Sequence, residues 1–280
     1  LDIRMEISVK NKIFHTQEWR IIMTQDERRE YLIQYLLKEE IRFGSQNIPT
    51  DKQGQENLLR SLMNVRPPRP ISNDFLKIQD EYLAERNIER GITDSAALAP
   101  VRSDSRLYIW QGDITTLKCD AIVNACNSQM LGCFSPMHAC IDNFIHTYAG
   151  IELRLKMHEI MTKQGHEEET GKAKITSGYN LPAKYILHTV GPIIQWEVTK
   201  EDEALLASCY TECLKLAADT GVESIAFCCL STGVFRFPQQ RAAEIATNTV
   251  KQYLDKDSRI KKVIFNVFKD EDLKIYNGLL

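Results

Sequence analysis

From residue 106 to the end of the sequence, short apolar segments alternate with longer amphipathic ones. The apolar segments have the length and composition of buried or half-buried strands, and they are RLYIWQGDI, AIVNA, KAKITSGY, YILHTVG, SIAFCCLS and KKVIFNVF. Between them, residues 142–163, 201–219 and 238–255 repeat apolar side chains at helical spacing. This alternation predicts an α/β fold in which helices cover both faces of a central sheet. Ligands of such sheets bind beyond the carboxyl ends of the strands.

Residues 1–100 follow a different pattern, which is helical and interrupted by loops. Thr24 and Glu27 have the spacing of a capping box, and apolar residues then recur at helical intervals from Tyr31. Two further apolar stripes, at 58–63 and 75–83, predict two more helices, the first ending before the prolines of RPPRP at 66–70. We therefore predict a helical N-terminal extension over 1–100, in which we identify no chemical motif, followed by one domain over 101–280.

Composition limits the classes of partner. The chain has 35 basic and 38 acidic residues, a formal charge of −3, and no block of basic residues, which disfavours a nucleic-acid partner. No stretch approaches the ~18 apolar residues of a membrane span, and no secretory pattern opens the sequence. We expect a cytoplasmic protein with a small-molecule or protein substrate. The eight cysteines lie mostly in apolar runs, so we expect no disulfides.

Three of the predicted strands end in polar sequence, namely QGDIT at 111–115, VNACNSQMLG at 123–132 and LSTGVFRFP at 230–238. Each motif alone is more typical of an ordinary turn or backbone cap. Together they mark a candidate ligand site, because a glycine-containing loop before a helix that Pro238 can open would present N–H groups to a phosphate. The sequence has neither GxxxxGK[ST] nor GxGxxG, which disfavours the common nucleotide-binding folds.

In this order along the chain, the motifs resemble those of macrodomains, the fold that binds ADP-ribose. The matching segments are GDIT at 112–115, VNA at 123–125 with Asn127 and Ser128, HTVGP at 188–192, STGVF at 231–235, and the ending VIFNVFKDEDLKIY. The resemblance covers about residues 100–280. It implies a three-layer α/β/α macrodomain with a mixed central sheet over 101–280, preceded by the helical N-terminal extension.

The resemblance also implies an ADP-ribose-binding site. Asp113 would accept a hydrogen bond from the adenine amino group beside the backbone of Ile114, and Asn127 would hold the distal ribose. Asn124, from the VNA motif, is included among the binding residues. The loop around the diphosphate would consist of Ser231, Thr232, Gly233, Val234 and Phe235. The aromatic side chain of that loop would lie against the distal ribose.

Asp142 matches the aspartate in the VDGAIH pattern of MacroD-type macrodomains, and it is a candidate catalytic residue together with Asn127. The preceding segment, GCFSPMHAC at 132–140, departs from that pattern, because MacroD-type proteins have a run of glycines there. The substitution resembles the zinc-dependent macrodomains of bacteria, which use a Cys-x4-His-x-Cys cluster in this loop. It implies Zn²⁺ as cofactor, with Cys133, His138 and Cys140 as its ligands.

The spacing of these residues sets a geometric condition. His138 and Cys140 would point about 200° apart in a regular helix, so they can share an ion only if the helix begins after them. Pro136 suits such an irregular loop, and Asp142 would then lie in the first helical turn, where the helix dipole favours its charge. Three protein ligands leave one position of a tetrahedral zinc open, which is typical of catalytic sites. By spacing alone, buried cysteines and a core histidine remain an alternative.

The other histidines and cysteines are expected to have structural roles. We place His146, His158 and His166 on helix or loop surfaces and expect His188 to make a hydrogen bond in the core. Cys228 and Cys229 also have the pattern of core residues.

Three functions remain open. The chain would be a hydrolase that removes mono-ADP-ribose from a modified protein, a reader that binds ADP-ribose without cleaving it, or an adaptor whose zinc only orders the loop. An open coordination position near Asn127 and Asp142 favours the hydrolase. The resemblance further implies a sirtuin-type ADP-ribosyltransferase as functional partner, and a mono-ADP-ribosylated lipoyl-carrier protein related to the glycine cleavage system as substrate.

Overall fold

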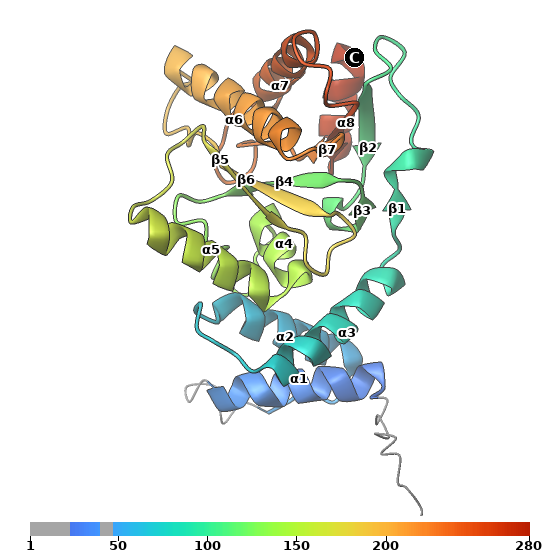
Figure 1. The fold of residues 1–280 in the computed structure, drawn as a ribbon, viewed down its shortest axis with the longest axis vertical. Coiled ribbons are helices and arrows are strands. Elements are labelled where there is room, and N and C mark those ends of the chain that lie inside the picture. The colour runs from blue at the N-terminus through green and yellow to red at the C-terminus, as the bar shows by residue number, and fades with distance from the viewer. Residues whose placement is uncertain (1–22, 40–46) are drawn as a thin grey trace, which may run out of the picture.

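The computed structural model describes residues 23–39 and 47–280, so the predictions for 1–22 and 40–46 lie outside the described residues. Figure 1 shows a central sheet with helices on both sides, and a group of helices from the N-terminal region below it. The predicted three-layer α/β/α arrangement with a helical N-terminal extension is therefore confirmed.

In its described residues, the extension contains the helices α1 (Gln25–Glu39), α2 (Lys52–Val65) and α3 (Asn73–Glu89). The capping box at the start of α1 is confirmed, because Thr24 N donates to Glu27 Oε2 at 2.7 Å and Glu27 N donates to Thr24 Oγ1 at 3.3 Å. Helix α2 ends directly before the RPPRP segment, as the prolines require.

In the part of the chain that the structure describes, the buried apolar residues form two clusters. One belongs to the domain that contains the central sheet, and the other fills the space between the helices of the extension, with members such as Leu32, Leu59 and Phe75. Ile151 of the sheet domain also belongs to the second cluster. The extension therefore packs against the sheet domain through a shared apolar contact. The exact boundary between 1–100 and 101–280 stays a prediction.

The central sheet contains β2 (Leu107–Gln111), β4 (Ala121–Cys126), β5 (Ala173–Ser177), β6 (Tyr185–Val190), β7 (Ser224–Phe227) and β8 (Lys262–Val267). Their order is β2-β8-β7-β4-β6-β5, with every pair parallel except β5 and β6. The sheet is mixed, as predicted. The short strands β1 (Thr93–Asp94) and β3 (Leu117–Lys118) pair separately.

Helices cover both faces of the sheet. In Figure 1, α4 (Ile141–Ala149) and α5 (Ile151–Gln164) lie between the sheet and the extension, whereas α6 (Lys200–Asp219) and α7 (Gln239–Leu254) lie on the other side. The single helix predicted over 142–163 is wrong. It is divided at Gly150, whose φ of 100° is accessible to glycine but not to a continuing helix. The terminal helix α8 (Asp270–Leu279) was not predicted.

The parallel arrangement brings the predicted motifs to one edge of the sheet. Strands β2, β4 and β7 run in the same direction; GDIT and LSTGVFRFP follow the carboxyl ends of β2 and β7, and VNACNSQMLG forms the end of β4 and the loop after it. The loops between β4 and α4 and between β7 and α7 are therefore neighbours. None of the helices that the structure describes combines the length and apolar character needed to span a bilayer.

Candidate active site

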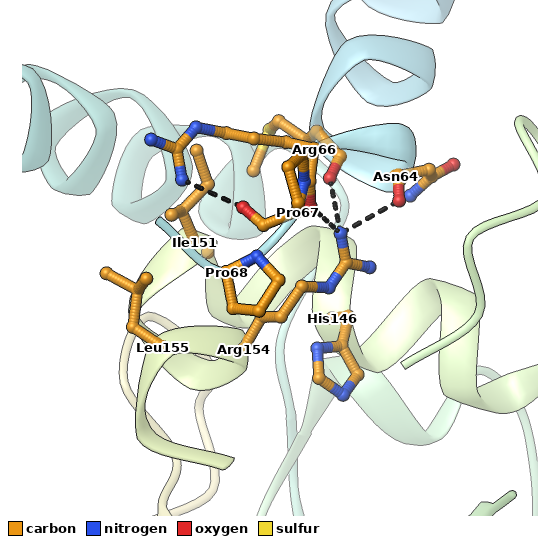
Figure 2. A pocket seen from close by; sticks show the side chains of 10 residues that line it. Asn64, Arg66, Pro67, Pro68, His146, Ile151, Arg154 and Leu155 are labelled. Atoms are coloured by element: carbon orange, nitrogen blue, oxygen red, sulfur yellow. Dashed lines mark hydrogen bonds between the residues drawn. The ribbon is translucent and has the colours of Figure 1, made fainter. Parts of the chain in front are cut away.

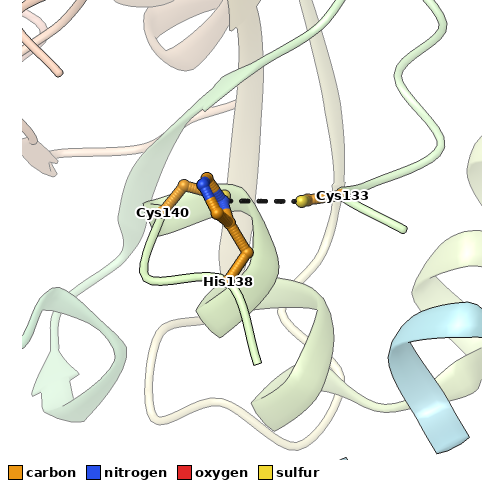
Figure 3. A group of neighbouring side chains, drawn as sticks. All are labelled: Cys133, His138 and Cys140. Atoms are coloured by element: carbon orange, nitrogen blue, oxygen red, sulfur yellow. Dashed lines mark hydrogen bonds between the residues drawn. The ribbon is translucent and has the colours of Figure 1, made fainter. Parts of the chain in front are cut away.

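Cys133, His138 and Cys140 converge in the loop between β4 and α4, as Figure 3 shows. Cys133 Sγ lies 3.7 Å from His138 Nδ1, and the ligand atoms of the three residues lie within 4.8 Å of one another. A tetrahedral zinc bound at ~2.0–2.3 Å needs its ligand atoms roughly 4 Å apart or less, so small side-chain movements would close the site. All three side chains are half-buried. This cluster can hold one metal ion.

The backbone of this loop satisfies the geometric condition set by the sequence. Helix α4 begins at Ile141, after all three ligands, and Cys140 is its N-cap, with Sγ accepting a hydrogen bond from Asn143 N at 3.4 Å. Gly132 has φ 82°, and a Cβ at that position would lie 2.7 Å from Cγ of His146. Glycine is therefore required at the start of the loop by both its backbone conformation and its close packing.

The Cys140 thiol does not ionise readily in the absence of a cation. Burial raises its pKa to about 12, and the neighbouring Cys133 adds to the shift by repelling a second negative charge. A coordinated metal reverses this balance, because it deprotonates a thiol ligand outright. The cluster is thus chemically suited to a soft divalent cation, and without one the Cys140 thiol would be neutral.

Asp142 lies in the first turn of α4, as predicted, but its carboxylate faces a buried polar network. The residue is 4% exposed, and its Oδ1 accepts a hydrogen bond from Asn124 Nδ2 at 2.8 Å. Burial raises the pKa of Asp142 to about 6, against the opposing effects of the Asn124 hydrogen bond and the Arg154 charge. The helix dipole was expected to favour the charge of this carboxylate, but burial has the larger effect.

Asn124 and His188 form the rest of this network. Asn124 Nδ2 lies 3.2 Å from His188 Nδ1, and His188 Nε2 lies 3.0 Å from Thr176 Oγ1. Burial lowers the pKa of His188 to about 3, so the imidazole is neutral and fills the predicted core role. Asn124 was predicted to bind ADP-ribose. Its side chain has no exposed surface and donates a hydrogen bond to the carboxylate of Asp142.

His146 was expected on the surface, and this prediction is wrong. The residue is 5% exposed, and its Nε2 lies 3.6 Å from Asp142 Oδ1, one helical turn away. Neither ring nitrogen has a hydrogen-bond partner among the described residues. Burial lowers the pKa of His146 well below its usual value. A helical histidine is equally compatible with either face, so only packing placed it inside. His158 and His166 are exposed, as expected.

Asp113 is held by its own turn and by the extension. Its Oδ1 accepts hydrogen bonds from Thr115 N at 2.9 Å and from Thr115 Oγ1 at 2.6 Å. Its Oδ2 pairs with the Nη2 of Arg90, the residue that follows α3. The guanidinium of Arg90 also lies 3.4 Å from the centroid of the Tyr148 ring. Sequence analysis missed Arg90, because its partners lie in distant parts of the sequence.

Asn127 caps the turn that follows β4. Its Oδ1 accepts hydrogen bonds from Gln129 N and Met130 N, both at 3.1 Å. This is the ordinary structural role of an asparagine after a strand. Its Nδ2 makes only a long contact of 3.5 Å with Gly132 O, which leaves a good donor for a ligand.

The loop Ser231–Phe235, which we call the phosphate loop, is shaped by backbone hydrogen bonds. Phe237 N donates to Ser231 O at 2.9 Å, and Arg236 N donates to Gly233 O at 3.0 Å. Gly233 and Val234 are exposed, and a Cβ on Gly233 would meet nothing within 4 Å in the described part of the chain. The loop can therefore accept a bound group without rearrangement of the core. Thr232 Oγ1 donates a hydrogen bond to Cys229 O at 3.0 Å.

Of the two predicted core cysteines, Cys228 is buried and Cys229 half-buried.

Comparisons with known proteins agree with this geometry. The Macro domain family matches residues 123–246. A protein-ADP-ribose hydrolase of Treponema medium is 58% identical over 260 residues, covering 92% of this chain and all of the relative. Another from Staphylococcus aureus strain MRSA252 is 51% identical over 250 residues, covering 89% of this chain and 93% of the relative.

Among solved structures, the Trypanosoma brucei macrodomain in complex with ADP-ribose has a TM-score of 0.61 at 29% identity, covering 79% of this chain and 94% of that structure. The Treponema alignment of 260 residues is longer than residues 101–280, so it includes part of the extension. With the fold, the motifs at one sheet edge and relatives of this similarity over nearly their whole length, the chain belongs to the macrodomain family.

Proposed function

We propose that this macrodomain is a zinc-dependent hydrolase that removes mono-ADP-ribose from modified protein side chains. The observation that carries the proposal is the convergence of Cys133, His138 and Cys140 at the ligand-binding edge of the sheet. Two thiolates and one imidazole suit zinc and leave a coordination position open. The printed names of the Treponema and Staphylococcus relatives support the hydrolase class.

The proposed binding mode follows the three strand-end motifs. Asp113 would accept a hydrogen bond from the adenine amino group, beside the backbone of Ile114. The exposed backbone around Gly233 would approach the diphosphate. Asn127 would donate its free amide hydrogens to the distal ribose, against which Phe235 would pack. The complex of the related trypanosome macrodomain with ADP-ribose supports this choice of ligand.

In the proposed mechanism, the metal, Asn127 and Asp142 have different roles. When bound, zinc would supply a Lewis acid that lowers the pKa of a water toward ~7 or polarises a ribose hydroxyl. Asn127 would fix the ribose, and Asp142 would orient the attacking water or accept its proton. Asn124 holds Asp142 Oδ1 at 2.8 Å, so the carboxylate is already oriented before substrate binds.

The proposed substrate is a mono-ADP-ribosylated lipoyl-carrier protein related to the glycine cleavage system, modified by a sirtuin-type ADP-ribosyltransferase in the cytoplasm. The support for this setting is the resemblance of the Cys-x4-His-x-Cys loop to zinc-dependent bacterial macrodomains. A formal charge of −3 without a basic block fits a protein substrate better than a nucleic acid.

One observation favours a second function, an ADP-ribose reader with a structural zinc. Asp142 is only 4% exposed, which is unusual for a residue that must contact a reacting water. A reader would need the fold and the phosphate loop but no accessible acid-base group.

One experiment separates the two functions. A defined mono-ADP-ribosylated carrier protein is incubated with the full chain, and free ADP-ribose is quantified with and without a zinc chelator and after zinc is restored. A hydrolase releases ADP-ribose, loses activity with chelator and recovers it with zinc. Binding of ADP-ribose without release under all conditions would identify a reader. Full release by a verified zinc-free protein would refute zinc dependence.

A further inference from the structure

We propose that the helical extension is a positioning part of the candidate active site, in which Arg60 and Asn64 of α2 hold the loop of residues 131–140, here called the metal loop, in its ligand-binding shape. The inference deepens the proposed function and rests on it for the identity of the metal. It assigns a role to the region in which the sequence indicated no chemistry.

Arg60 connects a metal-ligand residue to the start of α4. Its Nη2 donates to the carbonyl oxygen of His138 at 2.9 Å and to Asn143 Oδ1 at 2.7 Å, and its Nε also donates to that oxygen at 3.2 Å. Asn143 Nδ2 in turn donates to Ser135 O at 3.0 Å. The guanidinium lies 4.2 Å from the centroid of the Phe144 ring. One side chain from the extension therefore contacts residues on both sides of Cys140, the backbone of His138 before it and the side chains of Asn143 and Phe144 after it.

Asn64 holds the residue directly before His138. It is 1% exposed, and its Oδ1 accepts a hydrogen bond from Met137 N at 3.1 Å, while its Nδ2 donates to Thr147 Oγ1 at 3.0 Å. Met137 has φ 56°, a conformation that non-glycine residues seldom adopt. A strained residue persists only when its surroundings over-determine it, and here Asn64 supplies part of that support.

Arg154 of α5 ties the start of the metal loop to the end of α2. Figure 2 shows its guanidinium directed at the backbone around Asn64 and Arg66. Its Nη1 donates to the carbonyl oxygens of Met63, Asn64 and Arg66 at 3.0, 2.8 and 2.7 Å, and its Nε donates to Leu131 O at 2.7 Å. The last carbonyls of a helix lack partners within the helix and favour a positive charge. The C-terminal end of α2 is thereby joined to the loop.

These contacts reach the metal loop at its start, at its middle and at a ligand residue. The loop is not a helix or a strand, so its three ligand side chains would otherwise have to be ordered when the metal binds. Holding the loop in advance removes that cost and raises the metal affinity, as residues that hydrogen-bond to metal ligands do in other metal sites. Loss of the α2 contacts should therefore weaken metal binding specifically.

The test is the zinc affinity of Arg60→Met, measured on the full chain by competition with a chromophoric chelator. Methionine keeps an apolar stem of similar length but removes every donor to His138 O and Asn143 Oδ1. We expect the zinc dissociation constant to rise about 10–100-fold. ADP-ribose affinity, measured by calorimetry, should change much less, because the phosphate loop is shaped by macrodomain contacts. Arg60→Lys keeps the positive charge but lacks the planar set of donors of a guanidinium. Its zinc affinity should therefore lie between those of the wild type and Arg60→Met.

The matched control is Arg28→Met. Arg28 forms ion pairs with Glu81 and Glu85 at 3.2 and 2.8 Å, so its loss loosens the extension where α1 meets α3. Zinc affinity should stay at the wild-type value, and thermal melting of the zinc-free proteins checks that each variant is folded. If Arg60→Met is not folded, Arg60→Lys decides.

Two outcomes would overturn the inference alone, namely wild-type zinc affinity in the folded Arg60 variant, or an equal loss in Arg28→Met. Failure of the wild-type protein to bind zinc would instead overturn the proposed function, and this inference with it.

Discussion

The two loops of the candidate site obtain their shapes in different ways. The phosphate loop, Ser231–Phe235, is held by backbone hydrogen bonds with neighbouring residues of the same domain, including one from Ile194 N to Phe235 O at 2.9 Å. The metal loop depends on side chains from outside it, namely Arg60, Asn64 and Arg154. A loop that binds through its backbone can be shaped by backbone hydrogen bonds to nearby residues. A loop that must bring three side chains to one point requires support from the surrounding structure.

This difference leads us to expect separable functions. Changes in the metal loop should affect zinc and turnover while leaving ADP-ribose binding largely intact, and changes in the phosphate loop should do the reverse. The reason is that the two loops share an edge of the sheet but are supported by different contacts. Each prediction below either separates the two loops or shows that they act as one.

The largest effect is expected from Cys140→Ala, which removes a metal ligand. Zinc should be lost and release of ADP-ribose from the modified protein should fall to background, while calorimetry should still detect ADP-ribose binding. Because Cys140 is also the N-cap of α4, the control is Cys140→Ser, which restores a capping oxygen without restoring the thiolate. Elemental analysis that finds unchanged zinc in Cys140→Ala would remove the metal from this loop.

Next in size is Asp142→Asn, which removes the carboxylate charge but keeps an oxygen that Asn124 Nδ2 can reach. We expect turnover to fall by the ~10²–10⁴-fold typical of a positioned acid-base group, with zinc content unchanged. Single-turnover release of ADP-ribose measures the chemical step, and elemental analysis checks the metal. A rate near that of the wild type would leave the chemistry to the metal site alone.

Gly233→Glu should block ADP-ribose binding through the phosphate loop. A carboxylate beside the diphosphate adds like-charge repulsion, which costs several kcal/mol at a binding interface. The fold should be intact, because a Cβ on Gly233 meets nothing within 4 Å in the described chain. Calorimetry with ADP-ribose measures the loss, and zinc content should equal that of the wild type. Wild-type affinity in this variant would show that the diphosphate binds elsewhere.

The smallest effect is expected when one glycine in each loop is replaced by alanine. Gly132→Ala forces a side chain into φ 82° and within 2.7 Å of the His146 ring, so unfolding in denaturant should show a loss of at least ~1–2 kcal/mol. Gly233→Ala should stay within about 0.5 kcal/mol of the wild type, as exposed substitutions usually do. Equal losses in the two variants would contradict the view that only the metal loop is tightly packed.

Local patterns in the sequence were sufficient for most elements of the fold, the break between α4 and α5 and the terminal helix α8 being the exceptions. Alternation of apolar segments predicted every strand of the central sheet, and the Thr24–Glu27 spacing predicted the cap of α1. The two-residue spacing of His138 and Cys140 required a helix that begins after them, and α4 begins at Ile141. These features succeed because a strand, a cap or a helix start depends on residues only a few positions apart.

Only the tertiary structure decided which side chains support the site. Arg60 lies 78 residues from His138, and Asn64 lies 73 residues from Met137, so no local pattern connects them. The burial of His146 likewise depends on which face of α4 meets the sheet, and Asn124 faces the core although its motif predicted a ligand contact. Sequence periodicity records the conformation of neighbouring residues, whereas contacts between distant segments arise only when the helices of the extension pack against α4 and α5.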